Sequence, residues 1–146
     1  MRTAHTKEQR IQKQFFNTLH MWWGDDLTNF PFEPLVKFDP TISVRHFFRL
    51  RSTKLLLKLW TKAKESARDE GKSPLLVTKV EGAWFCISPL SMSMSDCGSV
   101  LTRRLGGDSV EIQSIDDFML SFEDANPSLF KTKPKLVVKT RAKKTA

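Results

Sequence analysis

The chain has 146 residues, 40% of them hydrophobic, including 11 Phe and 4 Trp. This is enough for one domain with a core that needs no metal or disulfide support. The absence of a long apolar run excludes a membrane span. The N-terminus lacks the apolar segment and cleavage site of a signal peptide, so we expect a cytoplasmic protein. Cys86 and Cys97 are then expected as free thiols, and without CxxC spacing or clustered His they do not indicate a zinc site.

The net charge of +8 is unevenly distributed along the chain. Residues 1–40 carry five basic and five acidic side chains, whereas residues 41–68 carry eight and one. Residues 69–130 carry four basic and ten acidic side chains, and residues 131–146 carry seven and none. Two basic blocks separated by acidic segments are typical of a protein that presents one face to nucleic acid, although a chance distribution of surface charge is the alternative.

The first predicted element is an amphipathic helix over residues 6–23. Thr6 is a suitable N-cap, and Gly24 ends the helix. The apolar stripe that defines it consists of Ile11, Phe15, Leu19, Trp22 and Trp23.

A polar turn over residues 25–29 follows, and Phe30-Pro31-Phe32 then leads into a short strand over residues 35–38. Pro34 makes the start of this strand irregular or places it at a sheet edge. Asp39-Pro40-Thr41 is a turn with capping chemistry, before a short helix over residues 42–50. Its inward-facing side chains are expected to be Ile42, Phe47 and Phe48.

A second strong helix is predicted over residues 53–70, capped by Thr53 and ended by Gly71 and Pro74. Its apolar stripe is Leu56, Trp60, Ala63 and Ala67. The other face is basic, with Lys54, Lys58 and Lys62 at helical spacing and Lys64 as a further candidate. Like charges four residues apart repel, which indicates a surface that phosphates neutralise, although simple solvation is the alternative.

Residues 75–80 and 83–87 are predicted to form a β-hairpin closed by Glu81-Gly82, with both strands apolar enough for the middle of a sheet. Residues 88–109 indicate a long loop, followed by a strand near 110–112 and a helix from Ile115 to about Phe122, capped by Ser114. Residues 131–146 are predicted to be a disordered basic tail. The order of elements predicts one α/β domain over 1–130, with a central mixed sheet flanked by helices.

Signatures of common enzyme sites, such as GxxxxGK[ST], GxSxG and HExxH, are absent. Four segments nevertheless occur in a suggestive order. They are Lys7-Glu8-Gln9-Arg10 leading to Trp22-Trp23-Gly24, Phe30-Pro31-Phe32 leading to Lys37, the Leu-rich helix 55–63 with Trp60, and Gly71-Lys72-Ser73-Pro74-Leu75-Leu76-Val77 followed by Trp84. In order and spacing, residues 7–122 resemble the phage-type Holliday-junction-resolvase-like branch of the PD-(D/E)xK nuclease superfamily. This resemblance implies a restriction-endonuclease-like core, in a protein of a phage-infected bacterial cell.

The resemblance also implies a site in which carboxylates hold Mg²⁺ and a lysine steadies the attacking water. Lys37 matches that lysine, but Leu35 stands where the motif has an acid, and Gln12 or Gln14 replaces the acid of the first helix.

Few carboxylates are left to complete such a site. Between the first helix and the strand there are only Asp25 and Asp26. Glu33 shares a strand face with Lys37 but lies two residues too early for the motif, roughly 7 Å along the strand. Only a bulge at Pro34 would bring Glu33 back. We therefore expect a degenerate site with no tightly bound metal or other cofactor.

Three functions compete. The leading hypothesis is a DNA-binding protein on a nuclease-like scaffold with weakened or lost catalysis, which binds branched or duplex DNA and forms a homodimer by analogy. The second is an active Mg²⁺-dependent structure-specific endonuclease that uses Asp25 or Asp26 with Glu33 and Lys37. The third is a structural or inhibitory protein that docks on an acidic partner. The candidate nucleic-acid ligands are Arg45, Arg49, Arg51, Lys54, Lys58 and Lys62, together with Lys131, Lys133, Lys135, Lys139, Arg141, Lys143 and Lys144 of the tail.

Overall fold

The computed structural model describes residues 2–48, 54–93 and 101–130. The helices are α1 (Arg2–Trp23), α2 (Val44–Phe48), α3 (Lys54–Glu70) and α4 (Ile115–Ala125), with short 3₁₀ turns η1 (Leu90–Met92) and η2 (Pro127–Phe130). The strands are β1 (Phe32–Lys37), β2 (Ser73–Val80), β3 (Ala83–Pro89), β4 (Leu101–Leu105) and β5 (Asp108–Ser114). No helix among these is long and apolar enough to cross a membrane.

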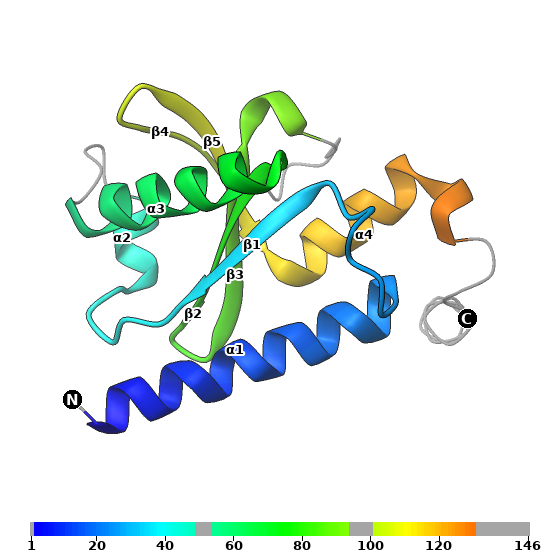
Figure 1. Ribbon diagram of the computed structural model, residues 1–146. Coiled ribbons are helices and arrows are strands. Elements are labelled where there is room, and N and C mark those ends of the chain that lie inside the picture. Colours follow the sequence, from blue (N-terminus) through cyan, green and yellow to red (C-terminus); the bar gives the residue numbers. More distant parts are fainter. Residues whose placement is uncertain (1, 49–53, 94–100, 131–146) are drawn as a thin grey trace, which may run out of the picture.

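The five strands form one mixed sheet in the order β1-β2-β3-β5-β4. β1 and β2 are parallel and are joined through α3, whereas the other neighbours are antiparallel. Figure 1 shows α3 over one face of the sheet and α1 and α4 over the other. The predicted α/β class, with a central mixed sheet flanked by helices, is therefore confirmed.

Alternating side chains of the strands supply two separate cores. On β2, Leu75 and Val77 pack under α1 and α4, whereas Leu76 and Val80 pack under α3. The α1 and α4 core is rich in aromatic side chains, which contact one another edge-on: Trp22 and Phe122 have ring centroids 5.6 Å apart. Such pairs stabilise a core by about 0.5–1.5 kcal/mol beyond their buried area.

Both long helices bury the stripes that their spacing predicts. Ile11, Phe15, Leu19, Trp22 and Trp23 are all buried on α1, and Leu56, Trp60, Ala63 and Ala67 are all buried on α3. α1 begins at Arg2, earlier than the predicted start at residue 6. It ends as predicted before Gly24, which adopts a φ of 122°.

The predicted hairpin is also confirmed, with β2 and β3 in the middle of the sheet. Glu81 and Gly82 form its two-residue turn, with φ values of 52° and 84°. Two positive φ values define the type I′ turn, whose twist matches that of the strands. The Glu81 carboxylate accepts a hydrogen bond from the amide of Val44 at 2.8 Å, which ties the turn to the start of α2.

Several boundaries differ from the sequence predictions. Residues 88–109, predicted as a loop, contain η1 and the edge strand β4, whose polar residues Thr102, Arg103 and Arg104 hide its strand character. β1 starts at Phe32, and it is an edge strand, as Pro34 predicts. α2 covers only Val44–Phe48 within the predicted range 42–50.

The C-terminal helix is predicted correctly at its start. Ser114 caps α4 by accepting a hydrogen bond from the amide of Asp117 at 3.1 Å. Predictions for Thr53 and for the tail 131–146 lie outside the described residues.

Candidate nucleic-acid interface

The solvent-facing side of α3 carries the predicted basic row. Lys54, Lys58 and Lys62 are exposed, whereas the opposite side of the helix is buried on the sheet through Leu56, Trp60 and other apolar residues. Each lysine is four residues from the next, about 6 Å along the helix. Within the described residues, none of the three lysines takes part in an ion pair. The helix therefore holds three accessible cations at fixed spacing.

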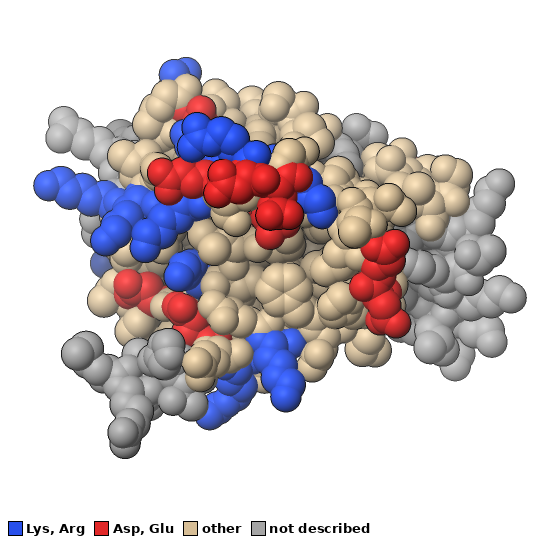
Figure 2. All heavy atoms as spheres, viewed as in Figure 1, with Lys and Arg blue, Asp and Glu red and all other residues tan. Residues whose placement is uncertain are grey.

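Beyond Lys62, α3 carries the cations Lys64 and Arg68 but three acidic residues, so this part of the helix has a net charge of −1. Glu65, Asp69 and Glu70 are exposed there. Figure 2 shows a band of acidic side chains on this face of the molecule, with basic side chains on more than one side of it. The row of unpaired lysines is therefore confined to residues 54–62, whereas the rest of the helix carries charges of both signs.

This order of charges opposes the helix dipole. The first turn contains Lys54 and no acidic residue, and the last turn contains Asp69 and Glu70, offset only by Arg68. Cations at an N-terminus and anions at a C-terminus each destabilise a helix by about 0.3–1 kcal/mol. Repulsion between Lys54, Lys58 and Lys62 adds to this. Local stability does not explain the arrangement.

The other predicted nucleic-acid ligands are placed as follows. Arg45 is exposed on α2, the element that precedes α3 in the chain. Arg49, Arg51 and the seven cations of the tail lie outside the described residues.

Lys64, the further candidate on α3, does not belong to the row of unpaired lysines. Its Nζ lies 2.6 Å from Oδ2 of Asp108 at the start of β5. The same carboxylate oxygen accepts the indole N–H of Trp60 at 2.9 Å. These two bonds lower the pKa of Asp108, the bond from Lys64 having the larger effect. Lys64 thus links α3 to the β4–β5 hairpin.

Glu33 and Lys37 lie near opposite ends of β1. The register with β2 runs without a break from Phe32 opposite Ser73 to Lys37 opposite Thr78, so no bulge at Pro34 shifts Glu33 toward Lys37. Four residues of strand separate the two by about 13 Å. Burial raises the pKa of Glu33, an effect that Lys72 partly offsets.

Lys37 is instead associated with the first helix. Its Nζ lies 3.8 Å from Oε1 of Glu8, and Oε2 of Glu8 accepts the amide of Phe38 at 3.0 Å. The lysine that matches the nuclease motif therefore pairs with an acid near the N-terminal end of α1.

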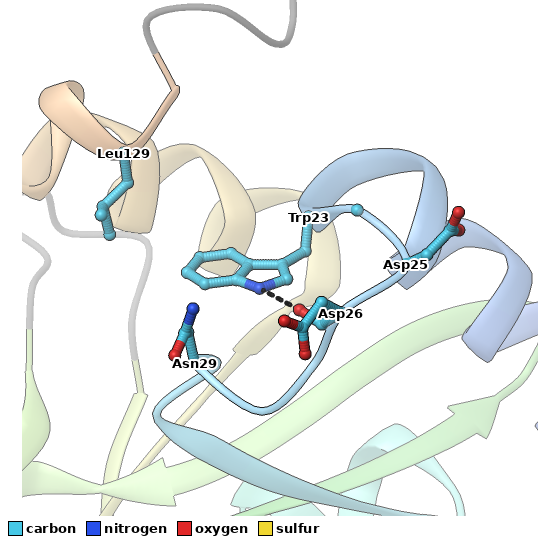
Figure 3. A pocket seen from close by; sticks show the side chains of 6 residues that line it. Trp23, Asp25, Asp26, Asn29 and Leu129 are labelled. Carbon is cyan, nitrogen blue, oxygen red and sulfur yellow. Dashed lines mark hydrogen bonds between the residues drawn. The ribbon is translucent and has the colours of Figure 1, made fainter.

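Asp25 and Asp26 follow the other end of α1. They line a pocket of about 410 Å³ with Trp23, Asn29 and Leu129. Figure 3 shows their side chains pointing apart, with the indole N–H of Trp23 donating to the backbone oxygen of Asp26. The Asp26 carboxylate accepts the hydroxyl and amide of Thr28, which lower its pKa.

The four candidate catalytic residues are therefore not brought together. About 15 residues of α1 separate Glu8, beside Lys37, from Trp23, which is roughly 22 Å of helix. In the part of the chain that the structure describes, no three His, Cys, Asp or Glu side chains form a group that could hold a metal. This geometry does not support Asp25, Asp26, Glu33 and Lys37 as one metal-dependent site.

Sequence reasoning missed Asp108 because it assigned residues 88–109 to a loop. The available signal was Gly106-Gly107, the two-residue turn between Leu105 and Asp108, which are opposite each other in the ladder. A Cβ on Gly106 would lie 3.1 Å from Cδ1 of Leu57, so this turn packs closely against α3.

Comparisons of the chain with protein-family models, with curated proteins and with solved structures found no match.

Proposed function

We propose that this protein binds duplex or branched DNA through the N-terminal half of α3, without itself cleaving the DNA. The observation that carries the proposal is the row of Lys54, Lys58 and Lys62, exposed on a helix whose other side is anchored in the core. The row covers about 12 Å, a length over which duplex DNA presents roughly seven phosphates. Phosphates would neutralise cations that the fold itself does not pair.

The charges next to the lysine row indicate over which elements the DNA contact extends. Arg45 on α2 is exposed and adds a cation from a second element. Beyond Lys62, the acidic residues Glu65, Asp69 and Glu70 outnumber the basic residues of α3, so the duplex contact is not expected to extend along the solvent-facing side of that part of the helix. We therefore expect DNA to contact α2 and the part of α3 from Lys54 to Lys62. The basic tail would add affinity for any DNA. Membership of the resolvase-like nuclease branch stays a hypothesis that rests on the sequence resemblance.

The test is a salt series of DNA affinity for a variant with Lys54, Lys58 and Lys62 changed to Ala. Each phosphate contact adds about 0.9 to the slope of log affinity against log salt, so the slope should flatten by roughly 2–3. Binding at low salt should weaken, and any preference for a four-way junction over linear duplex should disappear.

A matched control changes Lys7, Arg10 and Lys13 of α1 to Ala. These residues are also exposed, and the control removes the same charge from the helix layer on the opposite face of the sheet. It should keep most of the slope and the junction preference. If both variants lose affinity equally, net charge alone drives binding. An unchanged slope in the α3 variant would refute the interface and favour an acidic protein partner.

A further inference from the structure

A second recess lies beside the buried part of α3, away from the lysine row. It has a volume of about 690 Å³ and is open to solvent. One side is the C-terminal half of α3, with Lys64 and Arg68, and the other is the turn that leads into β5, with Asp108. The ends of β2 and β3 contribute Pro74 and Pro89. Its volume is within the range of about 300–1,000 Å³ that small-molecule sites occupy.

Three kinds of group line this recess. Lys64, Arg68 and Lys72 are cations, Asp108 is an anion, and Pro74, Pro89 and Leu90 are apolar. Leu90 is 37% exposed and lines the recess, so it supplies apolar surface that a ligand can contact. The lining thus combines a net positive charge with an apolar wall.

The three cations differ in the hydrogen bonds and ion pairs that they already make within the fold. Lys72 donates to the backbone oxygen of Leu27 at 2.8 Å and its charge acts on Glu33. Lys64 pairs with Asp108. Arg68 is exposed and forms no ion pair within the described residues. An anion in the recess is therefore expected to bind Arg68 first, with Lys64 as its second partner.

Asp108 supplies an acceptor of fixed orientation. Among the described residues, Trp60 and Lys64 both donate a hydrogen bond to its Oδ2. Trp60 is 1% exposed, so the hydrogen bond from its indole N–H reaches the carboxylate from the side of the core. Oδ1 takes no hydrogen bond from the described residues, which leaves it for a hydroxyl or amino donor of a ligand.

We infer that this recess binds a nucleoside 5′-monophosphate, as a free nucleotide or as the 5′ end of a nucleic-acid strand. Arg68 and Lys64 bind the phosphate through charge-assisted hydrogen bonds. The base lies against Pro74, Pro89 and Leu90, and Oδ1 of Asp108 accepts from the sugar or the base. This site is separate from the lysine row and does not depend on the function proposed above.

The experiment is calorimetric titration of the full chain with AMP, ribose 5-phosphate and adenosine. AMP should bind saturably and more tightly than either fragment. Arg68→Gln should weaken AMP binding by about tenfold or more, the effect of losing one charge-assisted contact. Leu90→Ser should weaken AMP binding but leave ribose 5-phosphate unchanged. Both side chains are exposed, so neither change threatens folding. Arg10→Gln, which changes an exposed cation of α1 outside the recess, is the matched control and should bind AMP normally.

A second arm separates the two sources of the ligand. In the background of the Lys54, Lys58 and Lys62 triple variant, a 5′-phosphorylated single strand is compared with the same strand bearing a 5′-hydroxyl. Preference for the phosphorylated strand, lost in Arg68→Gln, identifies a strand end. AMP binding without that preference identifies a free nucleotide. The inference is overturned if neither probe binds saturably, if Arg68→Gln binds AMP like the unaltered protein, or if Arg10→Gln loses as much affinity.

Discussion

The Asp108 carboxylate should stabilise the fold chiefly by satisfying a buried indole. Trp60 is 1% exposed, and Asp108 accepts its N–H at 2.9 Å. Asp108→Ala removes that acceptor, and an unsatisfied buried donor costs about 1–3 kcal/mol. The pair with Lys64 adds little, because the two side chains are 43% and 39% exposed and such pairs stabilise by about 0.2–1 kcal/mol. We expect Asp108→Ala to lower the free energy of unfolding by about 1–3 kcal/mol.

Asp108→Asn is the informative companion, because its amide oxygen still accepts from Trp60 while the charge is lost. We expect it to cost about 1 kcal/mol or less, similar to Lys64→Met. Urea unfolding followed by circular dichroism gives all three values, provided that the slopes of the transitions agree. Equal losses for Asn and Ala would show that charge dominates and would refute the indole argument. No loss for Ala would show that the bond to Trp60 does not contribute.

The pH dependence has a definite sign. The hydrogen bonds from Lys64 and Trp60 lower the pKa of Asp108 below its ordinary value of 3.8. A carboxylate with a lowered pKa stabilises the fold above its unfolded-state pKa, and this contribution is lost as the pH falls through the folded-state pKa. The stability difference between the unaltered protein and Asp108→Asn should therefore be constant at neutral pH and shrink below about pH 4. A difference that grows toward acid pH would contradict this assignment.

Two further predictions concern single positions. Gly82→Ala should destabilise the protein by about 1–2 kcal/mol through its φ of 84° alone, because a Cβ there meets no atom within 4 Å. Gly107→Ala, which also meets no atom within 4 Å but has no positive φ, is the control and should be near neutral when both variants are compared by urea unfolding. Cys86 is fully buried, and burial raises the pKa of its thiol. In a Cys97→Ser background, iodoacetamide should therefore modify Cys86 of the native protein roughly 100-fold more slowly than Cys86 of the unfolded chain. Comparable rates by mass spectrometry would mean that the β3 core opens readily.

The long helices and the β2–β3 hairpin could be predicted because their signals are local. The stripe of α1 and the Glu81-Gly82 turn need only neighbouring residues to be recognised. β4 could not be predicted in the same way. Thr102, Arg103 and Arg104 give it little apolar content, and its pairing with β5 at the sheet edge determines its conformation.

The candidate catalytic site illustrates a different limit. Alternation predicts that Glu33 and Lys37 share one side of β1, but it cannot tell which helix end lies beside each residue. The pairing of Lys37 with Glu8 depends on how α1 crosses the sheet, which is a tertiary property. The lysine row on α3 could be predicted because one helix contains all of it. The involvement of Lys64 with Asp108 could not, since 44 residues separate them.

The reversed charge order of α3 makes the protein respond to ionic strength in two ways. Salt screens the repulsion among Lys54, Lys58 and Lys62 and the unfavourable charges at the helix ends, which stabilises the helix. The same ions compete with phosphates for the lysines and weaken the proposed binding. A higher salt concentration is therefore expected to raise folding stability while it lowers DNA affinity. Bound DNA would supply the phosphates that neutralise these lysines. Because DNA would bind the folded protein and not the unfolded chain, its binding would raise the free energy of unfolding.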